Sequence, residues 1–320
     1  MTLRLVALFA IFAIGVGSWL LTCAAWRFDE VAAGVLPLEP RTFERLTLIT
    51  LGTGGAYENH LRRGPSTAVA LGERIQLVDA GRGVAESLRA AEIPVSQPEA
   101  VLLTSLLPEN TVGLDDLLVM GWIRGREQPL RLLGPPGTEA LARAIEAAVQ
   151  RGSEAWSRAL GPEGTPGFAV TEIEGGFREQ DGGLEILAGE LGGGPTEALA
   201  YRFEWRGRVA VVSATGWAAD ELARFAEGTH MLVHDGAMVP TPEQAAELGL
   251  EEDPEQLRRE AAFHTSLAQA AGIARRANAQ TLVLVRLRPP PVYDLQITSV
   301  VGDGFDGRVV VADDGDEFTP

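Results

Sequence analysis

The chain has 320 residues, a formal net charge of −17 and an apolar fraction of 46%. These figures exclude low-complexity disorder and collagen-like repeats, and they suit one large domain or two small ones. Cys23 is the single cysteine, so an intrachain disulfide and a thiolate zinc cluster are both excluded. All 27 lysine-or-arginine positions are arginine, and the acidic balance argues against a nucleic-acid ligand because phosphate binding needs clustered cations.

An uncharged run of 22 residues, Leu5–Trp26, stands close to the N-terminus. That length predicts a helix able to span a bilayer and favours an uncleaved anchor, with Arg4 on the cytoplasmic side. A cleaved signal peptide is an alternative, because the small residues at 22–25 could form its cleavage site. The sequence Leu20-Leu21-Thr22-Cys23 also resembles a bacterial lipobox, which would place a lipid on Cys23. All three alternatives put the globular part in the cell envelope or outside the cell.

The rest of the chain divides into a linker, residues 28–45, and one domain, residues 46–320. Pro37 and Pro40 mark the linker. Strand-like and helix-like patterns then alternate, and the acidic interval Thr241–Glu260 is expected to be a solvated insertion. The expected strands are Leu46–Leu51, Thr67–Leu71, Arg74–Val78, Ala100–Thr104, Phe168–Glu174, Leu184–Leu191, Leu199–Trp205, Arg208–Ser213, Met231–His234 and Thr281–Leu287. The expected helices are Val84–Ala91, Leu114–Trp122, Glu139–Leu160 with Thr138 as N-cap, Ala218–Ala226 and Thr265–Ala277.

Two familiar motifs are approached but not completed. Gly52-Thr53-Gly54-Gly55 follows a strand, yet a dinucleotide fingerprint needs a third glycine where Tyr57 stands. Ser105 and Ser213 both follow strands, yet neither has the flanking glycines of a serine-hydrolase elbow. A tight turn and two ordinary serines are the better interpretation.

A set of short segments in a fixed order resembles the metallo-β-lactamase superfamily, in its ribonuclease Z and exported arylsulfatase-like branch. The resemblance covers about Leu46 to Asp314. Its segments are Leu51–Gly54, Arg63–Ser66, Leu77–Gly83, Leu102–Thr104, Gly113–Leu117, Gly134–Thr138, Tyr201–Phe203, Leu232–Asp235, His264–Ser266 and Leu282–Leu284. It implies an α/β fold, a four-layer αββα sandwich with the active site along one edge of its two sheets.

The resemblance also implies two zinc ions that activate a water for attack on a phosphate or sulfate ester. The ligand positions of the family are nevertheless occupied by other residues, and just one good donor, Glu109, remains beside the weak donor Asn110. The substituted positions are Ser105, Leu107, Glu109, Asn110, Gly192–Gly194, Ala214 and Arg286. Zinc needs three or four nitrogen, sulfur or oxygen ligands, so we expect no zinc and no other cofactor.

Arg286 is a permanent cation at a former ligand position. It could replace the charge of the missing metals by pairing with Asp79 or Glu109, because uncompensated buried carboxylates are costly. Asp79 and Asp235 match acids near the family site, where Asp79 is chiefly structural. His234 and His264 match positions used around substrate phosphate, and buried, hydrogen-bonded histidines are the simpler alternative.

These observations predict an exported or membrane-anchored protein that has lost hydrolase chemistry and acts as a binding or scaffold module for an unknown ligand or protein. The alternative is a hydrolase of phosphodiesters or sulfate esters with a rebuilt, metal-poor site, using His234, His264 and Arg286. Ribonuclease activity on tRNA is the least expected variant, because the domain is acidic and no basic arm is visible.

Overall fold

A computed structural model describes residues 14–28, 31, 36–55, 60–192, 197–213, 219–247, 249, 251, 253–288, 297, 301–302 and 304–320. The chain divides into two units, Met1–Glu39 and Pro40–Pro320.

The first unit contains a helix over residues 14–28. Its large apolar side chains are exposed, Trp19, Leu21 and Trp26 among them. No helix within the described residues is long and apolar enough to cross a membrane. Residues 5–13, the first part of the expected spanning segment, lie outside the described residues, so the anchor stays a prediction.

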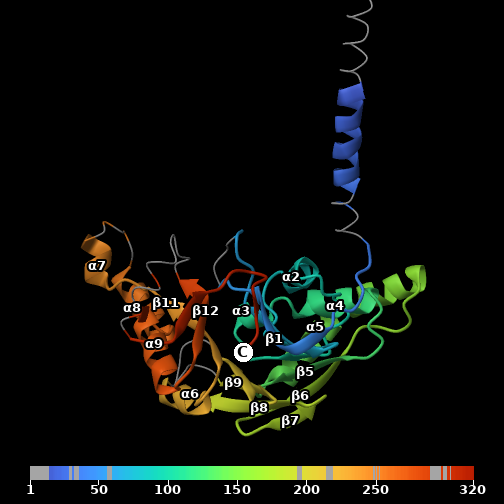
Figure 1. Ribbon diagram of the computed structural model, residues 1–320. Coiled ribbons are helices and arrows are strands. Elements are labelled where there is room, and N and C mark those ends of the chain that lie inside the picture. Colours follow the sequence, from blue (N-terminus) through green and yellow to red (C-terminus); the bar gives the residue numbers. More distant parts are fainter. Residues whose placement is uncertain are drawn as a thin grey trace, which may run out of the picture. The chain divides into compact units, whose positions relative to one another are not determined.

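The second unit holds two seven-stranded mixed sheets (Figure 1). In the first sheet β1 to β3 are antiparallel and β3 to β6 run parallel, in the order β14-β1-β2-β3-β4-β5-β6. Its strands are β1 Phe43–Gly52, β2 Ser66–Gly72, β3 Arg74–Val78, β4 Ala100–Leu102, β5 Leu130–Gly134, β6 Phe168–Glu172 and β14 Glu317–Phe318.

The second sheet has the order β13-β12-β11-β10-β9-β8-β7. Strands β10 to β13 are parallel, and β7 to β10 are antiparallel, with Trp205 and Arg208 closing the expected β9–β10 hairpin. Its strands are β7 Arg178–Asp181, β8 Leu184–Leu191, β9 Ala198–Trp205, β10 Arg208–Val212, β11 Met231–Ala237, β12 Thr281–Arg288 and β13 Arg308–Val311.

Three apolar layers join these elements into the expected αββα arrangement. The middle layer contains side chains from both sheets, such as Leu102 and Phe203, so the sheets pack face to face. The outer layers join the first sheet to α2, α4 and α5 and the second sheet to α6 and α9. The helices are α2 Val84–Ala90, α3 Pro108–Thr111, α4 Leu114–Ile123, α5 Thr138–Leu160, α6 Ala219–Phe225, α7 Pro242–Glu247, α8 Pro254–Phe263 and α9 Leu267–Arg276.

One sequence expectation is wrong in detail. Thr138 is not the N-cap of α5: Gly137 holds that position, and the Thr138 hydroxyl instead donates to the carbonyl of Pro135 at 2.6 Å. The described residues of the interval Thr241–Glu260 are mostly exposed, as expected of a solvated insertion, and they form α7 and most of α8. Asp253 caps α8 by accepting from the amide of Glu255 at 3.0 Å.

Candidate functional site

The candidate residues converge where parallel strands of both sheets end. Asp79 directly follows β3, and Ser105 comes three residues after the end of β4. Ser213 directly follows β10. Arg286 lies near the end of β12, at the register shift in its pairing with β11. Because carboxyl ends of parallel strands meet at one edge of a sheet, the two packed sheets bring these residues to one place.

An ion pair between Arg286 and Asp79 joins the two sheets at this edge. The Arg286 Nη2 atom lies 2.5 Å from Asp79 Oδ2, and the side chains are 7% and 0% exposed. The other terminal nitrogen, Nη1, donates to the carbonyl oxygen of Ser213 at 3.3 Å. The pairing expected from the sequence is therefore present, with Asp79 as the acid.

The Asp79 carboxylate is held from a second side by Thr104. Asp79 Oδ1 accepts from the Thr104 amide at 2.8 Å, and Oδ2 accepts from the Thr104 hydroxyl at 2.8 Å. Burial raises the pKa of Asp79 to about 6, against the opposing effects of the Arg286 charge and the Thr104 hydrogen bonds. The carboxylate is thus mostly ionised at neutral pH and matched to one cation.

Both partners of the ion pair have left-handed backbone conformations. Asp79 has φ 62° and Arg286 has φ 53°, a region that non-glycine residues adopt uncommonly and that aspartate adopts more readily than arginine. The Arg286 amide donates to the carbonyl of Thr53 at 2.7 Å, which ties β12 to the end of β1. Such strain persists where surrounding contacts determine the backbone, and it often accompanies functional sites.

The segment after β4 forms a packed, hydrogen-bonded turn. Asn110 donates from Nδ2 to the hydroxyls of Ser105 at 2.9 Å and Thr104 at 3.1 Å. Leu107 packs against the apolar layer that contains α6 and α9. Glu109 is half-buried and close enough to Asp79 to raise the pKa of that carboxyl. The turn therefore presents hydroxyls, an amide and an apolar side chain.

The two candidate histidines gather around Asp235, which is buried in β11. His234 Nδ1 lies 2.5 Å from Ser213 Oγ and 3.2 Å from Asp235 Oδ1, and His264 Nδ1 lies 3.9 Å from Asp235 Oδ2. Burial, together with the Arg286 charge, lowers the pKa of His234 to about 3. His234 is therefore neutral and structurally bonded, as the simpler alternative for these histidines expects.

The two remaining histidines lie apart from this cluster. His60 is exposed in a bend, and His230 precedes β11 at the strand's other end, where its Nδ1 accepts from the Val209 amide at 3.3 Å. Neither belongs to the candidate site.

The described donors do not fit the dinuclear zinc site that the resemblance implies. No group of three His, Cys, Asp or Glu side chains suited to a metal occurs in the described part of the chain. Asp79 already bonds Arg286 and Thr104, and a guanidinium there repels a divalent cation. Ala214 and Gly193–Gly194 lie outside the described residues, and neither side-chain type can ligate zinc.

Several buried polar atoms at this edge lack a hydrogen-bond partner within the described residues. They are Asn110 Oδ1, His234 Nε2 and Arg286 Nε. Orphaned polar atoms are rare in folded proteins and often mark a bound water or ligand. The edge thus offers one acceptor, one guanidinium donor and one imidazole nitrogen.

Three contributors to the site are not among the residues predicted to form it. Thr104, Ser213 and the carbonyl of Thr53 hold the ion pair and His234 in place. Hydroxyl residues after strands are common, so nothing in their spacing distinguishes them before the fold is known.

Comparison with known proteins places this geometry in context. No family model matches the chain. It is 28% identical over 277 residues to the ribonuclease Z of Mycobacterium bovis (strain BCG / Pasteur 1173P2), covering 84% of this chain and 96% of that protein. It is 29% identical over 271 residues to the ribonuclease Z of Mycobacterium sp. (strain KMS), covering 82% and 92%.

Solved structures show the same fold at lower identity. The metallo-β-lactamase fold protein YhfI from Bacillus subtilis matches with TM-score 0.67 and 16% identity, covering 86% of this chain and 99% of that chain. The short form of human tRNase Z matches with TM-score 0.62 and 16% identity, again covering 86% and 99%.

Proposed function

Since the chain belongs to the metallo-β-lactamase superfamily, in its ribonuclease Z branch, we propose that it is a non-catalytic member that binds a ligand or protein through this fold. The buried ion pair between Arg286 and Asp79 carries the proposal. The pair puts a cation where the resemblance expects a metal ligand. Its acid, Asp79, matches the aspartate that lies beneath the metal ions in zinc-binding members of the family. The fold persists because its sheets and helices have their own apolar layers.

The chemistry of the remaining groups supports the same proposal. Zinc supplies a hydroxide-strength nucleophile at neutral pH, and no described residue offers a substitute. Ser213 is buried and bonds the same histidine nitrogen that faces Asp235, so its hydroxyl is not arranged as an exposed nucleophile. The polar atoms at this edge are therefore suited to hydrogen bonding with a ligand and not to nucleophilic attack.

The names of the relatives favour a second candidate, a phosphodiester hydrolase with a rebuilt site. The curated relatives are named ribonuclease Z, and RNA enters as a candidate substrate through that name alone. In this candidate His264 acts as general base and Arg286 stabilises an anionic transition state. The charge of −17 argues against an RNA partner, since phosphate contacts need clustered cations.

Turnover assays separate the two candidates. Bis(p-nitrophenyl) phosphate, p-nitrophenyl sulfate and a precursor tRNA are incubated with the full chain, with and without added zinc. We expect no turnover above buffer. Turnover that His264→Ala abolishes and His230→Ala preserves would establish the hydrolase instead, because His230 lies at the far end of β11.

We also propose that the protein resides in the cell envelope, held by residues 5–26. The exposed apolar side chains of the helix over residues 14–28 support this location. We expect the full chain to sediment with membranes, and a variant lacking residues 1–27 to remain in the supernatant. Release of the full chain by Cys23→Ala alone would point to a lipid anchor, and a soluble full chain would refute membrane attachment.

A further inference from the structure

Three hollows form one groove along β6, away from the strand ends described above. Their volumes are about 510, 420 and 360 Å³. The first and second share Thr165, Pro166 and Gly167, and the second and third share Arg143 and Glu146 on α5. The groove therefore runs from the start of β6 to Glu172 at its end.

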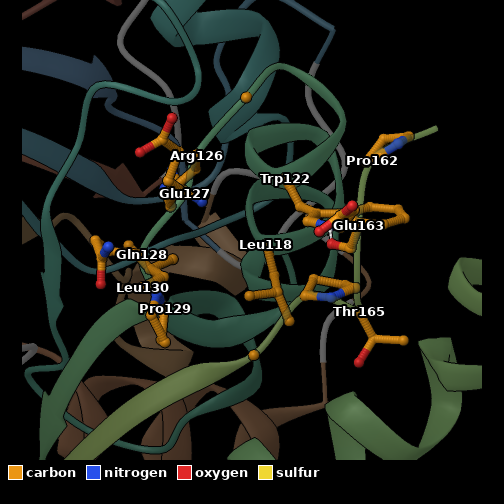
Figure 2. Close-up of a pocket in the computed structure, with 13 residues that line it drawn as sticks. Leu118, Trp122, Arg126, Glu127, Gln128, Pro129, Leu130, Pro162, Glu163 and Thr165 are labelled. Atoms are coloured by element: carbon orange, nitrogen blue, oxygen red, sulfur yellow. Dashed lines mark hydrogen bonds between the residues drawn. The ribbon is translucent and has the colours of Figure 1, made fainter. Parts of the chain in front are cut away.

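The largest of these three hollows has an apolar floor. Figure 2 shows Leu118 and Trp122, both from α4, between the segment Gln128–Leu130 and the segment Pro162–Thr165. The Trp122 indole nitrogen donates to the carbonyl of Glu163 at 3.4 Å, which fixes the ring against the wall. A volume of this size accepts one large apolar side chain and its neighbours.

The strand beside the groove is the last in its sheet within the described residues, with β5 as its neighbour. Gly167 accepts from Leu130 and Ile173 donates to Gly134, so odd-numbered residues of β6 bond to β5. By the alternation of a parallel ladder, the backbone groups of Phe168, Val170 and Glu172 point away from β5. The Phe168 amide donates to Glu146 Oε1 at 2.7 Å, which leaves Val170 at the centre of the outer edge.

The groove has an acidic lining. Its side chains include five glutamates, Glu127, Glu139, Glu146, Glu163 and Glu172, and two arginines, Arg126 and Arg143. Arg143 is already paired with Glu139 at 2.5 Å, and Arg126 donates to the carbonyls of Val95 and Leu117. The surface therefore favours a positively charged occupant.

We propose that the groove binds an extended, basic peptide segment, which adds as a strand to β6 and places an apolar side chain over Trp122. Backbone hydrogen bonds to an open sheet edge supply affinity in this mode, and alternate side chains supply specificity. A second copy of this chain is a poorer occupant, because it would bring the same glutamates together in a protein of charge −17. This inference is independent of whether the protein has catalytic activity.

The test uses a fluorescent seven-residue peptide of alternating arginine and valine and the full chain. Val170→Pro removes the outward amide while sparing the pairing to β5, and Val170→Ala is the matched control that keeps it. We expect binding to weaken about tenfold in Val170→Pro and to change little in Val170→Ala. We expect no binding when glutamate replaces arginine in the peptide.

A second set of probes needs no protein variant and decides the matter if Val170→Pro does not fold. Two peptides carry N-methyl groups on alternate residues, one on the odd and one on the even positions. Strand addition requires that one of them binds and the other does not, because alternate amides face the sheet. Equal binding of both, unchanged binding to folded Val170→Pro, or a wild-type dimer that Val170→Pro dissociates would overturn the proposal.

Discussion

At the scale of single residues, the Arg286–Asp79 pair combines charge balance with strained backbone. A buried ion pair contributes little against well-packed apolar replacements, but removing one partner leaves an uncompensated charge. The pair also bonds Thr104 and the Ser213 carbonyl, so it ties β3, the segment after β4, and β10 to β12. Its main structural effect is to fix how the two sheets meet at the candidate site.

We expect Arg286→Ala to lower the free energy of unfolding by about 3–5 kcal/mol, because Asp79 is left buried and unpaired. The double variant Arg286→Met with Asp79→Leu should lose less than Arg286→Ala alone. Arg143→Ala is the control, since its exposed pair with Glu139 contributes about 0.5 kcal/mol or less. Denaturant unfolding measures all three, and a loss for Arg286→Ala as small as that control would contradict the description of the pair.

The buried His234 predicts how the free energy of unfolding depends on pH. Its folded pKa of about 3 lies below its ordinary 6.5, so acid protonates the unfolded state first. The contribution of neutral His234 to the free energy of unfolding is therefore fully present above pH 6.5. It is lost progressively as pH falls toward 3. Asp79 acts in the opposite direction, because its raised pKa lets the folded state take up a proton between about pH 6 and 3.8.

The measurement is the difference between wild type and His234→Gln on going from pH 7 to pH 5. We expect the variant to retain about 2 kcal/mol more of its neutral-pH stability than the wild type does. Chemical denaturation at both pH values supplies the four free energies. Parallel losses in the two proteins would show that His234 does not titrate as its burial requires.

At the scale of elements, most strands and helices could be predicted because their apolar periodicity agrees with the layers they join. Strand β3 has the expected bounds, and β12 differs by one residue. Strand β7, Arg178–Asp181, was missed because an edge strand of four polar residues has no apolar pattern. Helices α7 and α8 were not predicted, because their acidic, proline-containing sequence is typical of a loop. Each helix buries a single residue, Ala245 in α7 and Leu257 in α8, so neither has an apolar periodicity.

The candidate site was predictable in part, for a similar reason. A cation at a position where the family has a metal ligand predicted a carboxylate partner, either Asp79 or Glu109, and the structure shows that the partner is Asp79. The hydroxyls of Thr104 and Ser213 could not be chosen, because their partners are more than 20 residues away in sequence. Distant hydrogen bonds become visible when the sheets are assembled.

An element-scale expectation concerns the start of α9. Ser266 and Gln269 form a reciprocal capping box, with Gln269 donating to Ser266 Oγ at 3.2 Å and the Ser266 amide donating to Gln269 Oε1 at 2.8 Å. We expect Ser266→Ala to lower unfolding free energy by about 1 kcal/mol. Ser157→Ala, inside α5, should be neutral or slightly stabilising, and thermal unfolding distinguishes the two.

At the scale of the whole molecule, the fold and the chemistry are separable. Three apolar layers hold the two sheets and their helices together, and none of them depends on a metal. The fold is that of a hydrolase superfamily, yet function belongs to the site and not to the fold. The ion pair at the strand ends and the acidic groove beside β6 are the two features on which we base the proposed binding functions.

We propose that this protein does not hold a dinuclear zinc site, and the metal content of the purified protein tests that proposal most directly. The full chain is purified without chelator, incubated with excess zinc, desalted and measured by inductively coupled plasma mass spectrometry. We expect zinc well below one equivalent, because the described residues provide no set of three or four ligands. About two tightly held equivalents, lost on incubation with a chelator, would contradict the account.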